Sequence, residues 1–352
     1  MPATIKLVIC DDSPLMRKLL AKMLSADATI QVVAEAENGE QCLAKIAEHS
    51  PDVVLLDLAM PQLDGLETLR QAKARNLDTA FLVVSTKAVK DAPATLDALK
   101  EGAVDFITKA QGMLQMESIQ SEVLSKVKNA AEARWRNQRG AAAPDPTPSP
   151  APAARPAVTG TGKSLTVLGG SAGCMQVLPG ILSALPEKIG GALVLILKLP
   201  PFLTRQIPVQ FGKSTTIPIE VATAGQPLSG GRIYVAPGGD TNLTFERDPT
   251  GKRVVFKLEP PAEKAAEGTP SIDAAMAAAA KLFRDSTRGV LISGTGKDGL
   301  EGLRAIMTAG GETVIQDRTT AMAPQLVIAA AEAGLAQRTL SPGDIAALLA
   351  AR

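Results

Sequence analysis

Runs of apolar residues alternate with amphipathic segments along most of the chain. In the first part, strand-like runs lie at residues 5–12, 30–38, 51–58, 80–86 and 102–109. Residues 13–26 carry apolar side chains three and four positions apart, and this spacing predicts a helix. Strands that are apolar on both faces and alternate with helices predict a parallel sheet covered on both sides.

The same alternation returns after residue 163, with strand-like runs at 165–171, 191–198, 231–237 and 289–296. Between the two parts, residues 136–163 are rich in Pro, Ala and Thr and show no apolar periodicity. Such a segment cannot bury enough surface to offset its ordering entropy. The sequence therefore predicts an α/β fold with two doubly wound parallel-sheet domains. We place these domains at 1–128 and 163–352, with a flexible Pro/Ala-rich linker at 129–162.

Composition and charge narrow the classes of function. The chain has 37 Lys and Arg against 36 Asp and Glu, so charge gives no argument for a nucleic acid or an anionic membrane as partner. No apolar run approaches the roughly 20 residues needed to cross a bilayer, and the N-terminus has no secretory signal. The three cysteines are too widely spaced for a disulfide framework or a zinc site. We expect a cytoplasmic protein without membrane insertion.

Polar residues of the first domain gather where its predicted strands end. Asp11 and Asp12 follow the first strand and Asp57 ends the third. Ser85 ends the fourth strand and Lys109 ends the fifth. Ligands of doubly wound sheets bind outside the carboxyl ends of the strands. Three carboxylates that lie close together need a cation, and oxygen ligands of this kind suit Mg²⁺. Asp57 would then be the carboxylate that attacks a phosphoryl group.

These residues, with "DLAMPQLDG" around Asp57, resemble the receiver domain of response regulators over about residues 5–128. The resemblance implies phosphorylation of Asp57 by a histidine kinase, with Ser85 and Lys109 supporting the phosphoryl group. It also implies a magnesium site made of Asp11, Asp12 and Asp57.

Two further residues of the first domain bear on this interpretation. Ala110 follows Lys109 where the receiver family usually has Pro, so we expect the adjacent loop to have a different shape. His49 is the single histidine of the chain. We expect it at a helix end on the surface, away from the acidic residues.

The second domain has two glycine-flanked polar residues at predicted strand ends. Ser171 follows "LTVLGG" and precedes a helix, where backbone N–H groups can stabilise an oxyanion. A helix-capping role for Ser171 explains the same pattern. Asp298 lies in "GTGKDG" after another strand, and adjacent parallel strands would bring the two residues to one crevice. Neither turn has the glycine spacing of a dinucleotide site.

Five segments of this domain are similar to the catalytic domain of the chemotaxis protein-glutamate methylesterase (CheB) family. They are "GGSAG", "KLPPFLTRQ", "IYVAPGG", "TPSIDAAM" and "GTGKDG", and the similarity runs from about Leu165 to the C-terminus. The resemblance implies hydrolysis of glutamyl methyl esters on chemoreceptors, and often deamidation of receptor glutamines. It implies a Ser-His-Asp triad without a cofactor in this domain, covered by the unphosphorylated receiver.

Carried onto this sequence, the triad makes Ser171 the nucleophile and Asp298 the orienting acid, and its histidine position falls on Lys198. The site departs from the family also at Thr295, where a methionine is common. A lysine with an ordinary pKa near about 10 is protonated at neutral pH and cannot take a proton from serine. A neighbouring carboxylate favours the protonated form further. We therefore expect an ion pair between Lys198 and Asp298 that leaves Ser171 unactivated.

Two hypotheses of different classes follow. In the first, the protein is a phosphorylation-regulated methylesterase with an altered Ser171–Lys198–Asp298 site, and Ser-Lys pairs do catalyse acyl transfer on other folds. In the second, it is a pseudoenzyme that regulates by phosphorylation-dependent binding. The absence of histidine from residues 163–352 favours the second, and the retention of Ser171 and Asp298 favours the first. The sequence leaves the enzymatic activity open.

Overall fold

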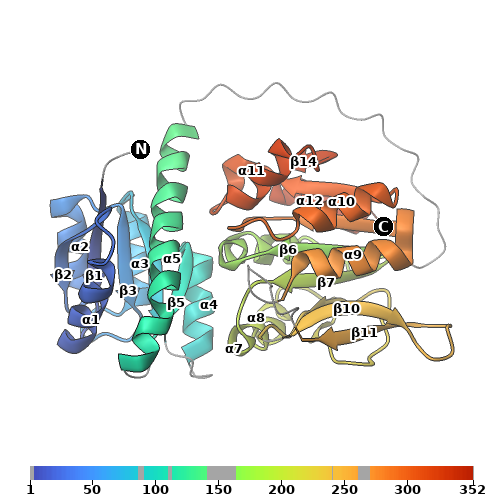
Figure 1. The fold of residues 1–352 in the computed structure, drawn as a ribbon, viewed down its shortest axis with the longest axis horizontal. Coiled ribbons are helices and arrows are strands. Elements are labelled where there is room, and N and C mark those ends of the chain that lie inside the picture. The colour runs from blue at the N-terminus through green and yellow to red at the C-terminus, as the bar shows by residue number, and fades with distance from the viewer. Residues whose placement is uncertain are drawn as a thin grey trace. The chain divides into compact units, whose positions relative to one another are not determined.

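The computed structural model describes residues 4–85, 91–109, 113–140, 164–239, 241–260 and 270–351. The chain divides into two compact units, Met1–Ala143 and Pro144–Arg352 (Figure 1). Each unit contains a parallel sheet packed with helices, as the alternating pattern predicts.

The first unit is built on a five-stranded parallel sheet with the order β2-β1-β3-β4-β5. Its strands are β1 Ile5–Cys10, β2 Ile30–Ala36, β3 Val53–Asp57, β4 Ala80–Ser85 and β5 Asp105–Thr108. All five predicted strands are confirmed. The order reverses between β1 and β3, so the carboxyl ends of these two strands flank the crevice where doubly wound sheets bind ligands.

Five helices cover this sheet: α1 Pro14–Leu24, α2 Gly39–His49, α3 Gly65–Ala74, α4 Ala92–Glu101 and α5 Met113–Gly140. α1 packs against α5, while α2, α3 and α4 pack in a row (Figure 1). Polar side chains begin several of these helices; Ser13 Oγ accepts a hydrogen bond from Met16 N, and Asp64 Oδ1 accepts one from Glu67 N. Such caps satisfy N–H groups that have no partner inside the helix.

α5 extends beyond the expected domain boundary at residue 128, so the prediction of a flexible linker is wrong for residues 129–140. Ala130, Ala131 and Ala133 are buried, and they form an apolar stripe that packs the helix onto the unit. Trp135 Nε1 donates a hydrogen bond to Asp52 Oδ1 at 2.8 Å. Alanine, glutamate and arginine favour helix here, and the Pro-rich composition begins only after this segment. The rest of the expected linker, 141–162, lies outside the described residues.

The second unit is built on a seven-stranded parallel sheet with the order β14-β13-β12-β6-β7-β9-β8. Its strands are β6 Leu165–Gly170, β7 Ala192–Leu197, β8 Ile219–Val221, β9 Ile233–Val235, β12 Thr287–Leu291, β13 Glu312–Gln316 and β14 Arg338–Leu340. The four predicted strands correspond to β6, β7, β9 and β12, which are consecutive in the sheet in the order β12-β6-β7-β9. A separate antiparallel pair, β10 Asn242–Arg247 with β11 Val254–Glu259, was not expected from the pattern.

The helices of the second unit are α6 Leu178–Ser183, α7 Pro201–Thr204, α8 Ile207–Phe211, α9 Ile272–Phe283, α10 Leu300–Thr308, α11 Gln325–Glu332 and α12 Pro342–Ala350, with short 3-10 helices at Ala172–Gln176, Arg284–Ser286 and Arg318–Thr320. Of these, α9 and α10 position the site described below. α9 packs against α10 and against β6 (Figure 1). The C-terminal segment "SPGDIAALLAAR" forms α12, which begins after the capping residue Ser341.

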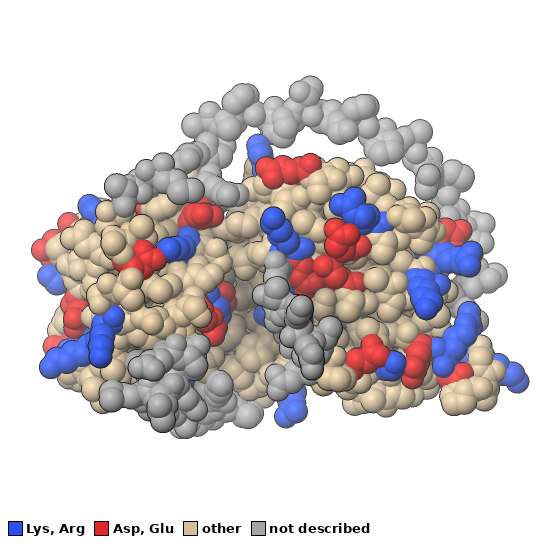
Figure 2. Space-filling model, in the orientation of Figure 1, with Lys and Arg blue, Asp and Glu red and all other residues tan. Residues whose placement is uncertain are grey.

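Surface charge shows no segregation on the face drawn in Figure 2, where acidic and basic side chains lie interspersed over the described surface. No helix among the described residues is long and apolar enough to span a membrane. The three cysteines, Cys10, Cys42 and Cys174, are buried free thiols.

Candidate functional sites

The acidic residues predicted for the first domain meet at the carboxyl ends of β1 and β3. One carboxylate oxygen from each of Asp11, Asp12 and Asp57 lies within 4.8 Å of the others. Lys109, just after β5, places Nζ 2.7 Å from Asp57 Oδ2 and 3.0 Å from Asp11 Oδ2. Asp11 and Asp57 are buried and Asp12 is exposed, so one side of the cluster faces solvent. The structure therefore brings together four of the five residues that the sequence analysis grouped here by strand ends.

Burial and pairing act against each other in this cluster. Burial raises the pKa of Asp57, and the hydrogen bond from Lys109 opposes that rise without cancelling it. Burial alone would lower the pKa of Lys109, but its hydrogen bond to Asp57 and the charges of Asp57 and Asp11 raise this pKa on balance. Lys109 is thus held as a cation beside the carboxylate that is expected to receive a phosphoryl group.

The cluster fits a divalent cation by the chemistry of its donors. Asp11 Oδ2 is buried and accepts no hydrogen bond among the described residues, although it forms an ion pair with Lys109. Asp12 and Asp57 add two more carboxylates, and hard oxygen donors with an open solvent side suit Mg²⁺. These three residues would hold the metal.

Ser85, the predicted hydroxyl, ends β4 and is buried. Its Oγ lies 2.7 Å from Thr95 Oγ1 of α4, and its backbone oxygen accepts a hydrogen bond from Lys109 N at 2.7 Å. The Lys109 N contact ties the strand end of Ser85 to that of Lys109. Thr95 was not singled out from the sequence, because a threonine inside a helix gives no distinctive pattern. Ala110 lies outside the described residues.

His49 is the last residue of α2, as predicted, with Nε2 3.5 Å from Glu48 Oε1. Since His49 is the only histidine of the chain and belongs to the first unit, the second unit contains no imidazole.

In the second unit, Ser171, Lys198 and Asp298 follow three neighbouring strands. Ser171 comes directly after β6, Lys198 directly after β7, and Asp298 lies in the loop between β12 and α10. The strand order reverses between β12 and β6, where a crevice is expected. Thr295 N donates a hydrogen bond to Ser171 Oγ at 3.3 Å, which joins the β12 loop to the serine. Lys198 N donates to the oxygen of Gly170 at 2.9 Å. The structure thus places all three predicted residues at one edge of the sheet.

The expected ion pair of Lys198 with Asp298 is confirmed. Lys198 Nζ lies 3.0 Å from Asp298 Oδ2, and the two side chains are only 15% and 7% exposed. No hydrogen bond joins Lys198 Nζ to Ser171 Oγ among the residues that the structure describes. An adjacent carboxylate favours the charged form of an amine. Among the described residues, Ser171 therefore has no basic partner to accept its proton.

Asp298 also caps helix α9. Its Oδ1 accepts hydrogen bonds from Ser271 Oγ at 3.1 Å and from Asp273 N at 2.9 Å. Its Oδ2 accepts one from Ile272 N at 3.0 Å, beside the bond from Lys198. The α9 N-terminus therefore fixes the carboxylate with three donors, and Lys198 supplies a fourth.

Asp273 caps helix α10 in the same way. Asp273 Oδ1 accepts hydrogen bonds from Gly299 N at 2.8 Å and Gly302 N at 2.6 Å. Asp273, in α9, thus caps α10, while Asp298, just before α10, caps α9. Burial raises the pKa of Asp273, the charge of Asp298 adds to the rise, and the two N–H donors oppose it. Sequence reasoning quoted "TPSIDAAM" but assigned Ser271 and Asp273 no role. The signal was a capping serine followed by an acid in the first helical turn.

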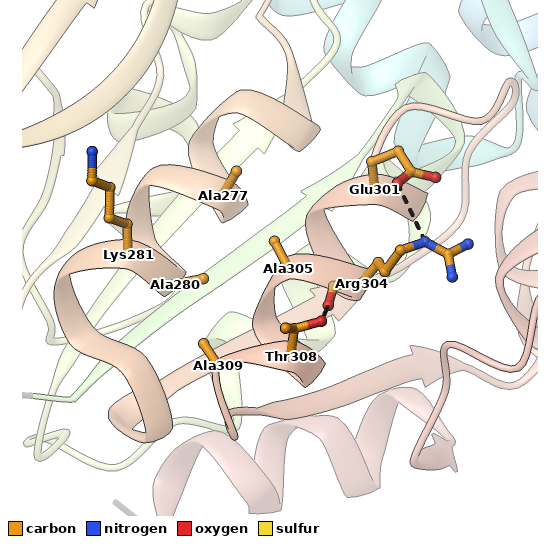
Figure 3. Close-up of a pocket in the computed structure, with 8 residues that line it drawn as sticks. All are labelled: Ala277, Ala280, Lys281, Glu301, Arg304, Ala305, Thr308 and Ala309. Atoms are coloured by element: carbon orange, nitrogen blue, oxygen red, sulfur yellow. Dashed lines mark hydrogen bonds and ion pairs between the residues drawn. The ribbon is translucent and has the colours of Figure 1, made fainter.

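A separate hollow lies between α9 and α10. It is lined by Ala277, Ala280, Lys281, Glu301, Arg304, Ala305, Thr308 and Ala309. Figure 3 shows the small alanine side chains facing it and the ion pair of Glu301 with Arg304 at one end. Its lining includes none of the predicted site residues, and we assign it no chemistry.

Comparison with known proteins decides the family. The model of the CheB methylesterase family matches residues 166–349, and that of the response regulator receiver domain matches residues 7–120. The chain belongs to the CheB methylesterase family. It carries a receiver domain in front of the methylesterase-type domain.

Two relatives cover the chain almost completely. It is 35% identical over 348 residues to "Protein-glutamate methylesterase/protein-glutamine glutaminase 1" of Carboxydothermus hydrogenoformans, covering 98% of each chain. It is 34% identical over 364 residues to a protein of the same name from Oleidesulfovibrio alaskensis, covering 97% of each. Among solved structures, the Thermotoga maritima CheB methylesterase catalytic domain matches with a TM-score of 0.51 and 25% identity. That match covers 54% of this chain and 98% of the other. These likenesses agree with the fold and the order of the two domains.

Proposed function

We propose that the protein is a chemosensory response regulator that is phosphorylated on Asp57 and whose methylesterase-type domain binds chemoreceptor glutamyl sites while hydrolysing them poorly. The observation that carries this proposal is the Lys198–Asp298 ion pair, which leaves Ser171 without a basic partner among the described residues. A histidine kinase is the phosphodonor. The protein encounters this kinase and the chemoreceptor sites in the cytoplasm.

The acidic cluster supports the first half of the proposal. Asp57 attacks the phosphorus atom of the donor, a new aspartyl oxygen–phosphorus bond forms, and the bond to the donor breaks. Lys109, already 2.7 Å from Asp57, remains to pair with the added negative charge. Mg²⁺ held by Asp11, Asp12 and Asp57 would neutralise charge on the incoming phosphoryl group.

Phosphate incorporation in the presence of Mg²⁺ tests this half. Asp57→Asn is expected to abolish incorporation, because an amide cannot attack phosphorus. Asp97→Asn, which changes an aspartate of α4 that pairs with Lys100, is the matched control and is expected to label like the wild type. Labelling of Asp57→Asn at the wild-type level would refute the assignment of the phosphorylation site.

The altered triad supports the second half. Losing the general base of a Ser-His-Asp triad typically costs about 10⁴- to 10⁶-fold in turnover, and oxyanion contacts and binding remain. The position of Ser171 directly after β6, with Thr295 N 3.3 Å from its Oγ, supports the retention of an oxyanion contact. The site is therefore equipped to bind a glutamyl group better than to cleave it.

A serine-directed fluorophosphonate probe tests whether Ser171 is activated, because such probes label nucleophilic serines. We expect no labelling of the wild type at Ser171 and clear labelling of Lys198→His, with Ser171→Ala as the blank in both backgrounds. Wild-type labelling that Ser171→Ala removes would instead favour a second candidate, a working esterase in which Lys198 serves as base. The retention of Ser171 beside Lys198 and Asp298 is the observation behind that candidate.

A further inference from the structure

A receptor glutamyl position can carry a carboxylate, a methyl ester or an amide, and only the first of these is charged. We propose that the site around Lys198 selectively binds the free carboxylate side chain, so that the second domain recognises demethylated receptor. This inference rests on the proposed function and names the chemical form of its ligand.

The first argument is the balance of charge at Asp298. The carboxylate has about four acceptor positions. Three are filled from the start of α9, by Ser271 Oγ, Ile272 N and Asp273 N, and the fourth by Lys198 Nζ. N–H groups at a helix N-terminus carry partial positive charge and stabilise a carboxylate. Asp298 would thus remain well solvated without Lys198, and the charge of the lysine exceeds what the carboxylate requires.

The second argument is the number of donors on Lys198. An ammonium group has three N–H bonds, and the described residues provide one acceptor, Asp298 Oδ2. The side chain is 15% exposed and follows directly on β7, at the sheet edge where Ser171 follows the neighbouring strand β6. A ligand acceptor that reaches this sheet edge can therefore approach the lysine side chain.

The other groups of the crevice are also donors. Thr295 N points to Ser171 Oγ at 3.3 Å, and the serine hydroxyl has a proton of its own to donate. A carboxylate offers two charged oxygens to these donors. Hydrogen bonds between ionised partners are shorter and roughly twice as strong as neutral ones, whereas an ester or amide offers one neutral carbonyl.

Asp273, a second acid that interacts with Asp298, does not cancel this preference. Asp273 directs Oδ1 to Gly299 N and Gly302 N at the start of α10, so the partial positive charge of that helix balances its carboxylate. A neutral histidine in place of Lys198 would remove the cation and with it the selectivity for a carboxylate. The presence of Lys198 at the family's histidine position therefore changes which ligand the site prefers, and it also removes the base of the triad.

The test is a binding measurement on the full chain carrying Ser171→Ala, which blocks hydrolysis and keeps the probes intact. Three fluorescent peptides of one chemoreceptor methylation segment would differ only at the glutamyl position: carboxylate, methyl ester or amide. We expect the carboxylate form to bind about tenfold or more tightly than the other two.

Variants assign that preference to the lysine. Lys198→Gln is expected to abolish the preference, and Lys198→Arg to keep most of it. Lys188→Gln removes an exposed lysine from the loop before β7, at the opposite edge of the sheet, and should leave the preference unchanged. Circular dichroism confirms that each variant is folded before it is compared.

Equal or tighter binding of the ester or amide, no binding of the carboxylate form, or a preference that survives Lys198→Gln would overturn the inference. Failure of the proposed function is a different result, namely Ser171-dependent ester cleavage by the wild type. The two failures are separate because selectivity is measured in a background that cannot hydrolyse.

Discussion

Lys198 directly follows a strand whose six residues are all buried, and its ammonium group lies 3.0 Å from a carboxylate that is only 7% exposed. A buried charge is tolerated in a protein when it is paired and when hydrogen bonds satisfy both partners. Here donors at the start of α9 satisfy the acid, and the acid pairs with one of the three N–H groups of the lysine. The Lys198–Asp298 pair stabilises the buried charges and also leaves Ser171 without a basic partner among the described residues. The structural and the chemical effect of Lys198 therefore have the same cause.

Removing the charge of Lys198 is expected to cost stability at the residue scale. In Lys198→Met, Asp298 stays buried with three donors but without its cation, and we expect a loss of about 2 kcal/mol in unfolding free energy. Chemical denaturation of the full chain, followed by circular dichroism, measures this loss. The control Lys188→Met, at an exposed loop position, is expected to change stability by less than about 0.5 kcal/mol. Equal stability of wild type and Lys198→Met would show that the ion pair contributes nothing.

At the scale of elements, α9 and α10 exchange caps across the site. Asp298 precedes α10 and caps α9, while Asp273 lies in the first turn of α9 and caps α10. The loop that carries Asp298 is therefore fixed twice, by the hydrogen bonds of Asp298 to the start of α9 and by those of Asp273 to the start of α10. The position of Asp298 thus depends on Asp273, which does not contact Lys198 or Ser171 among the described contacts.

Two substitutions separate the acceptor role of Asp273 from its charge. Asp273→Ala leaves the buried N–H groups of Gly299 and Gly302 without their acceptor, and we expect a loss of about 2 kcal/mol. Asp273→Asn keeps an oxygen at Oδ1 and is expected to retain most of the stability at neutral pH. Denaturant unfolding measures both variants, and a loss in Asn as large as in Ala would contradict the capping role.

The raised pKa of Asp273 also predicts a pH dependence. A carboxyl group whose pKa is higher in the folded state adds stability that is fully present below its unfolded pKa, near about 4. That stability is lost as the pH rises through the folded pKa. Asparagine does not titrate there. Wild type should therefore lose stability relative to Asp273→Asn as the pH increases from about 3 to about 7, and a gain over that range would be evidence against the burial of this acid.

The C-terminal part of α5 is also held in place by contacts of a few residues. Asp52 receives hydrogen bonds from Arg134, Trp135 and Lys6 N. Asp52→Ala is expected to destabilise the first unit by about 2 kcal/mol and to alter the fluorescence of Trp135, the only tryptophan. Asp78→Ala removes a more exposed partner of Arg134 and should change stability by less than about 0.5 kcal/mol. Similar effects of both variants would contradict a specific clamp at Asp52.

Periodicity and strand ends were sufficient to predict the two sheets and most of the site. Apolar runs buried on both faces, such as β3 and β7, leave no alternative to a parallel sheet, and polar residues just after them must lie at its carboxyl edge. The Lys198–Asp298 pair was predicted through the resemblance to the methylesterase triad, which placed Lys198 at the histidine position beside the orienting acid Asp298.

Other features could not be read from the sequence, for identifiable reasons. The short strands β8 and β14 have three residues each and contain no buried residue, unlike β9, which is equally short but fully buried. The linker prediction failed at 129–140 because helix formers precede the Pro-rich segment without a breaker. The reciprocal caps of Asp273 and Asp298 depend on two helix ends meeting in space, which local sequence does not encode.

At the scale of the whole molecule, two units of one fold class present different chemistry at corresponding positions. The first gathers three carboxylates and a lysine at the carboxyl edge of its sheet, an arrangement suited to accepting a phosphoryl group. The second gathers a serine, a lysine and one aspartate at the same kind of edge, with the lysine committed to the aspartate. We therefore propose that this member of the CheB methylesterase family signals through binding, with little ester hydrolysis.

The most direct test is methanol release from methylated chemoreceptor, measured with the full chain before and after phosphorylation of Asp57. Ser171→Ala sets the background, and Lys198→His restores an imidazole beside Asp298. The account predicts that wild type releases no more methanol than Ser171→Ala in either state, and that Lys198→His releases it in a Ser171-dependent way. Wild-type release that phosphorylation stimulates and Ser171→Ala abolishes would contradict the account and establish a methylesterase that works with lysine at this position.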